Sequence, residues 1–82
     1  MRLRPRVLTE LAARGIAPGP DDTPAGLRER LNDTYLEDVR RLRERQRVGE
    51  IPLRDYARHV QQLKESYPLL GLPLDQWLEP SG

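Results

Sequence analysis

Cysteine is absent from the 82-residue chain, and histidine and tryptophan occur once each. The absence of cysteine excludes disulfide bonds, cysteine-ligated zinc, iron–sulfur clusters and thiol nucleophiles. A chain without cysteine also suits a reducing compartment, and we expect a cytoplasmic protein.

Long hydrophobic runs are absent as well. The first residues carry charge without an apolar segment behind them, so they do not resemble a secretory signal. No apolar run approaches the roughly 20 residues that cross a bilayer, and we expect no membrane association. Hydrophobic residues make up 37% and charged residues 33% of the chain, a balance typical of a charged helical domain. We expect one small domain over residues 1–82, with 1–4 and 79–82 frayed.

Groups that perform catalysis are scarce. A catalytic site holds a nucleophile, an acid or a base against a partner, and the chain offers only His59 and the two serines, Ser66 and Ser81. Asp55 stands one helical turn before His59, but any charge pair on a helix surface has this spacing. No glycine-rich phosphate loop follows a strand. We therefore expect a protein that is not an enzyme and has no metal, cofactor or small-molecule substrate.

Eight prolines and six glycines divide the sequence into segments with the apolar spacing of helices. No window alternates apolar and polar residues in the manner of a strand between turns. The second segment carries the clearest apolar stripe, formed by Leu27, Leu31, Tyr35, Val39 and Leu42. The predicted helices cover about 5–14, 24–48 and 52–66, and an apolar tail with one short helical turn follows.

Local signals mark the ends of these helices. Thr23 is suited to cap the second helix, and Pro24 is suited to its first position because its missing N–H costs nothing there. Gly15 and Gly49 follow the first and second helices, where glycine commonly ends a helix. The connection across 49–52 is so short that the helices it joins must be antiparallel neighbours. The sequence predicts an all-α domain of three to four helices built on an antiparallel helical hairpin, with an apolar C-terminal tail.

Two apolar features are candidates for contact with another chain. The tail is the most apolar stretch of the sequence, and it either folds back to complete the core or docks on a second chain. Leu36 lies about 120° from the centre of the apolar stripe, so it is either a second contact surface or a lone exposed leucine. We predict a protein–protein interaction or oligomerisation module, with self or another protein as the partner. The candidate contacts are Leu36, Leu74, Trp77 and Leu78.

Arginine supplies thirteen of the fourteen basic residues. Arg40, Arg43 and Arg47 share one side of the second helix within about 60°, and guanidinium groups suit phosphates. Nucleic-acid binding through these three residues is therefore the alternative function. The competing interpretation is a solvated helix face on which acidic residues pair with arginines, as Glu37 and Arg41 would at a spacing of four. The net charge of +1 favours the second interpretation.

Overall fold

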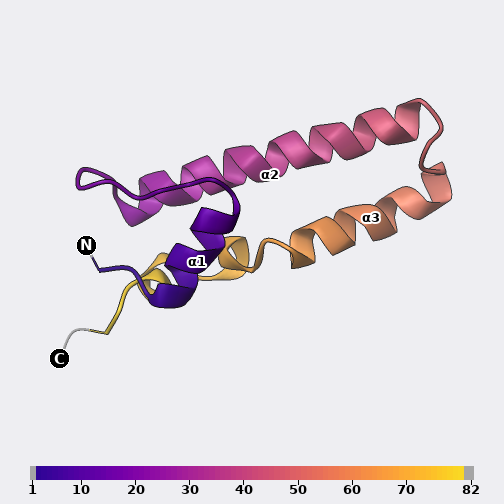
Figure 1. The fold of residues 1–82 in the computed structure, drawn as a ribbon. Helices are drawn as coiled ribbons and strands as arrows, with labels where there is room; N and C mark the ends of the chain where they lie inside the picture. The colour runs from indigo at the N-terminus through magenta and orange to yellow at the C-terminus, as the bar shows by residue number, and fades with distance from the viewer. Residues whose placement is uncertain (1, 81–82) are drawn as a thin grey trace.

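The computed structural model describes residues 2–80 and is all-α, as the sequence predicts. No strand occurs within this range, and no helix in it is long and apolar enough to cross a membrane. Figure 1 shows α2 and α3 side by side and antiparallel, joined by a tight turn. The elements are α1 (Pro5–Ala13), α2 (Pro24–Arg47), α3 (Leu53–Glu65) and the 3₁₀ turns η1 (Pro68–Gly71) and η2 (Leu74–Trp77).

The expected local signals set the ends of the helices. Thr23 caps α2, since its side-chain oxygen accepts a hydrogen bond from the backbone N–H of Gly26 at 3.1 Å. Gly15 and Gly49 have φ angles of 74° and 88°, in the left-handed region that favours glycine. The turn after α2 is therefore specified locally, and it brings α3 back along α2.

The hydrophobic core lies at one end of the molecule, where α1, the first part of α2 and the C-terminal tail meet (Figure 1). The tail folds back onto its own chain, the first of the two alternatives for this segment. Two antiparallel helices do not enclose a core alone, and the tail supplies the missing layer. The largest fully buried side chains are Trp77, Leu11, Leu27, Leu69 and Val7.

The two ends of the described chain pair with each other. Leu3 and Leu78 form an isolated antiparallel bridge, and the backbone N–H of Arg4 donates to the carbonyl of Trp77 at 3.0 Å. Leu3 is also buried in the core. Burial and these backbone hydrogen bonds offset part of the entropy of ordering the ends, while the fraying of 1–4 and 79–82 stays a prediction. Residues 1, 81 and 82 lie outside the described residues.

Beyond the core the α2–α3 hairpin projects alone, and it gives the molecule its length of 52 Å against 20 and 17 Å in the other directions. The buried residues of α2 are Leu27 and Leu31, both in its first third, and α3 has none. Val39 and Leu42 continue the predicted stripe, but they are only half-buried. No third element covers this part of the hairpin in Figure 1, which explains why the stripe stays partly exposed.

Candidate functional site

The four predicted contact residues lie in two different environments. Trp77 is fully buried, and Leu74 and Leu78 are half-buried against the core cluster. Their side chains close the core of their own chain, so Trp77 is not available to a partner in this fold. Leu36 lies on α2 and exposes 42% of its surface, and it is the one of the four that a partner can reach directly.

The free half of the hairpin exposes further apolar side chains. Val48 and Leu53, on either side of the turn, are 59% and 72% exposed. Along α3, Tyr56, Val60 and Leu63 are half-buried. α3 therefore has an apolar face that α2 covers only in part, and none of its residues is buried. An apolar face of this kind at a projecting end is typical of a contact surface.

A groove of about 440 Å³ lies between α2 and α3 on this part of the hairpin. Leu42 and Leu63 contribute its apolar lining, and its remaining lining residues are polar or charged. Apolar residues flanked by charged ones suit the side chain of a protein partner better than a buried small molecule, which needs deeper enclosure. The polar and charged lining residues are Asp38, Arg41, Arg45, His59 and Gln62.

The single histidine, His59, lines this groove and is half-buried. The carboxylate of Asp55, one turn earlier, lies 3.9 Å from the guanidinium of Arg58 in an ion pair. Between residues 2 and 80, no three histidine, aspartate or glutamate side chains gather in a way that suits a metal ion.

Acidic side chains engage most of the arginine cluster of α2. Arg40 lies 3.0 Å from the carboxylate of Glu37. Arg47 donates to both carboxylate oxygens of Glu44, at 2.8 and 3.0 Å. This hydrogen bonding lowers the pKa of Glu44 and raises the pKa of Arg47. Within residues 2–80, Arg43 alone of the three predicted phosphate contacts has no ion pair and no side-chain hydrogen bond.

The ion pairs on α2 differ in spacing from the expected one. Arg41 pairs with Asp38 at 3.3 Å rather than with Glu37, so the pairs on this face join residues three apart. Arg45 pairs with Glu50 of the connecting turn at 3.1 Å. Four of the five arginines between residues 40 and 47 therefore lie beside a carboxylate, which offsets part of their charge.

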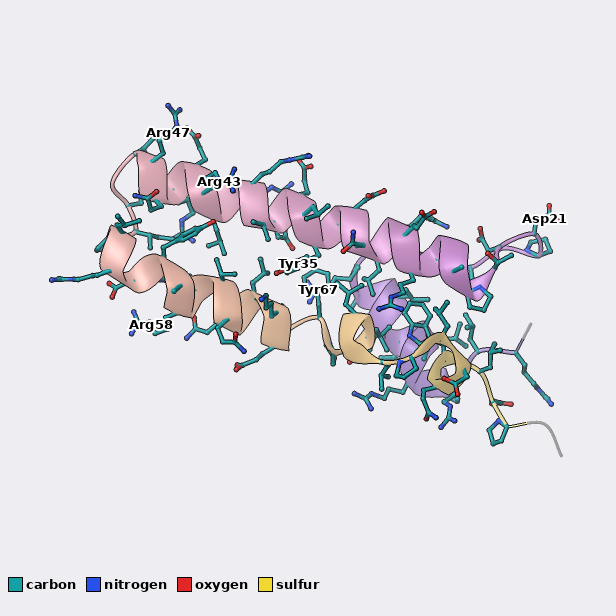
Figure 2. The ribbon with its side chains drawn as sticks, turned by 180° about the vertical axis from the view of Figure 1, so that it is seen from behind. Asp21, Tyr35, Arg43, Arg47, Arg58 and Tyr67 are labelled. Atoms are coloured by element: carbon teal, nitrogen blue, oxygen red, sulfur yellow. The ribbon has the colours of Figure 1, made fainter. Side chains whose placement is uncertain are left out.

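A joint between the hairpin and the core was not predicted from the sequence. The hydroxyl of Tyr67 donates to a carboxylate oxygen of Asp38 at 2.5 Å, and Tyr35 packs against the same ring at a centroid distance of 5.3 Å. Figure 2 shows the two tyrosines together between α2 and α3. Arg14 lies 3.9 Å above the Tyr67 ring and also donates to the carbonyl of Ser66. Burial, helped by the hydrogen bond to Asp38, raises the pKa of Tyr67 to about 12.

The sequence carried no signal for this joint, because its members are far apart along the chain. Tyr67 and Asp38 are separated by 29 residues, and periodicity places each of them only relative to its own helix. Comparison with known proteins adds nothing to this geometry. No family model, no curated protein and no solved structure matches the chain.

Proposed function

We propose that the chain is a non-catalytic protein–protein interaction module whose contact element is the free half of the hairpin, residues 36–63. The observation that carries the proposal is the apolar face of α3, of which no residue is buried. Apolar area that leaves water contributes about 25 cal/mol per Å². A partner that lies along the hairpin would remove this face from water and gain that free energy.

The shape of the hairpin supports the same proposal. Two antiparallel helices are half of a helical bundle, and bundles close when further helices cover the exposed seam. The exposed side chains of Val48 and Leu53 lie on the projecting part, away from the closed core, and the exposed Leu36 lies on α2 between Tyr35 and Asp38 of the joint. A partner with an amphipathic helix of its own fits such a surface best.

Nucleic-acid binding through Arg40, Arg43 and Arg47 has less support. Arg40 and Arg47 already bind carboxylates, so a phosphate would have to compete with an acidic side chain three residues away. The net charge of +1 provides no strong field to draw a polyanion. This function remains the alternative prediction.

A crosslinking experiment tests the proposal in cells that make the full chain. A photoreactive amino acid replaces Leu53 on the hairpin and, as a matched control, Arg6 on α1. Both positions are exposed, so neither replacement disturbs the core. We expect discrete protein adducts from position 53 and none from position 6.

The outcome separates the candidate functions. Absence of adducts from positions 36, 48 and 53 alike would contradict the proposed function. If nuclease shortens the crosslinked partner and protease leaves it intact, the partner is a nucleic acid. That result would establish the nucleic-acid alternative in place of the proposed function.

A further inference from the structure

We infer that the partner is a second copy of this chain, with the two α2 helices packed antiparallel about a two-fold axis at Leu36. The inference rests on the proposed function, since it names the partner of the same hairpin, and it extends the contact surface along the outer edge of α2 as far as Glu29. It is argued from the charge pattern on the outer edge of α2, where an acidic residue precedes Leu36 and a basic residue follows it at equal distance.

Glu29, Leu36 and Arg43 lie along one line on α2. Glu29 and Arg43 each stand seven residues from Leu36. At 3.6 residues per turn, both charged side chains point within about 20° of Leu36 and lie about 10 Å from it along the axis. All three residues are exposed. Figures 1 and 2 show one long edge of α2 with no other element beyond it, so a second helix can approach there.

Glu29 and Arg43 also lack partners among the described residues. Within residues 2–80, neither side chain forms an ion pair or a hydrogen bond, whereas Arg40 and Arg47 on the same side of the helix are held by carboxylates. The stripe therefore presents one free carboxylate, one exposed leucine and one free guanidinium in a row.

An antiparallel second copy meets this row with opposite charges. A two-fold axis at Leu36 places the two leucines against each other and Glu29 of each copy opposite Arg43 of the other, so the favourable pair forms twice. Ala25 and Arg47 each stand eleven residues from Leu36, on opposite sides of it. The two-fold axis therefore places the small side chain of Ala25 in one copy opposite the long side chain of Arg47 in the other. A parallel arrangement would instead oppose like charges and align the two helix dipoles unfavourably.

The proposed contact between the two α2 helices is limited to two copies and buries a small area. A two-fold axis uses the same residues on both copies, so association stops at a dimer. One helix edge per copy corresponds to the low end of interface sizes, below about 1,200 Å² in total. We therefore expect a dimer that dissociates on dilution and weakens as salt rises, because its ion pairs lie in contact with solvent.

Charge reversal tests the pairing in the purified full chain. Light scattering after size exclusion, over a series of concentrations, gives the dimer dissociation constant for the wild type, Glu29→Arg, Arg43→Glu and the double variant. We expect each single variant to dimerise about tenfold more weakly or worse, because two like-charge contacts replace two attractive ones. The double variant should regain the wild-type constant, and an equal mixture of the two single variants should form a heterodimer.

Arg54→Glu is the matched control, since Arg54 is an exposed arginine of the same hairpin outside the stripe. It should leave the dissociation constant unchanged, and unchanged melting temperatures should show that every variant folds. A monomeric wild type at all concentrations, or single variants that dimerise as tightly as the wild type, would overturn the inference. A monomeric wild type that still gives protein adducts from position 53 in cells would overturn this inference alone and leave the proposed function standing.

Discussion

The two ends of this molecule are built from similar amphipathic helices, but they bury the apolar side chains of these helices to different extents. At one end, α1, the start of α2 and the tail together remove Leu11, Leu27 and Trp77 from solvent. At the other end, α2 and α3 lie side by side, and Ile51 in the connecting turn is buried. Burial of an apolar stripe thus depends on whether a third layer reaches it, and here the third layer stops partway along the hairpin.

The largest expected effect contrasts a core residue with a hairpin residue. Trp77→Ala should lower the free energy of unfolding by about 3–5 kcal/mol, because it removes a large, fully buried side chain and leaves a cavity. The free energy of unfolding of an 82-residue wild type is about 4–12 kcal/mol, so this variant should be close to unfolded. Leu53→Ala, at a 72% exposed position, should stay within about 0.5 kcal/mol of the wild type.

Urea unfolding followed by circular dichroism measures both variants. Similar losses for Trp77→Ala and Leu53→Ala would mean that the projecting end is as tightly packed as the core, and the contrast between the two ends would fail.

A smaller effect is expected from the same substitution in the two glycine turns. Gly15→Ala and Gly49→Ala each force a methyl group into the left-handed region, at a cost of about 1–2 kcal/mol. An added Cβ meets nothing within 4 Å at either position, so the cost comes from the backbone alone. Gly15 ends α1 next to the buried Ile16, so Gly15→Ala should lower global stability, while Gly49→Ala should mainly promote local opening of the hairpin turn.

Amide hydrogen exchange distinguishes global from local opening in these two variants. We expect faster exchange over the whole core in Gly15→Ala and only around residues 45–56 in Gly49→Ala. If Gly49→Ala accelerates exchange in the core equally, the two ends unfold as one cooperative unit.

The smallest effect is expected at the joint between the two ends. Tyr67→Phe removes the hydrogen bond to Asp38 and should cost about 1 kcal/mol. The pKa of Tyr67 rises from 10.0 to about 12 on folding, so its contribution to stability is complete below pH 10 and is lost as the pH rises through about 12. The wild type should therefore lose more stability over this pH range than Tyr67→Phe does.

Unfolding curves at pH 10 and pH 12, together with tyrosinate absorbance, test this difference. Tyr56→Phe is the control, because Tyr56 lies half-buried on α3 outside the joint. An identical alkaline loss in wild type and Tyr67→Phe would show that the joint does not link the hairpin to the core.

The helices could be predicted to within one residue because their end signals are local. Thr23 and Pro24 start α2, and Gly15 and Gly49 end the first two helices, each through the conformation of one or two residues. The antiparallel hairpin followed from the short connection alone. The exposure of Leu36 was likewise visible from its angle to the apolar stripe.

The extent of burial could not be predicted in the same way. Periodicity places Leu31 and Leu42 on one face of α2, but only Leu31 is buried, because the covering elements reach it and not Leu42. Those elements are positioned by contacts between distant residues, such as Leu3 with Leu78 and Asp38 with Tyr67. Such contacts cannot be predicted from the local sequence pattern. They set how far the covering elements extend along the hairpin, and therefore which part of it, including the candidate site, stays uncovered.

The bridge between Leu3 and Leu78 has a consequence for how the domain joins to other chains. The polypeptide enters and leaves at one point, and in Figure 1 that point lies at the opposite end from the hairpin turn. Spliced into a surface loop of a host protein, the domain would need two linkers that start side by side. It would then stand upright on the host with the turn at Gly49 farthest from it, as a spacer about 50 Å long whose lateral edges stay free.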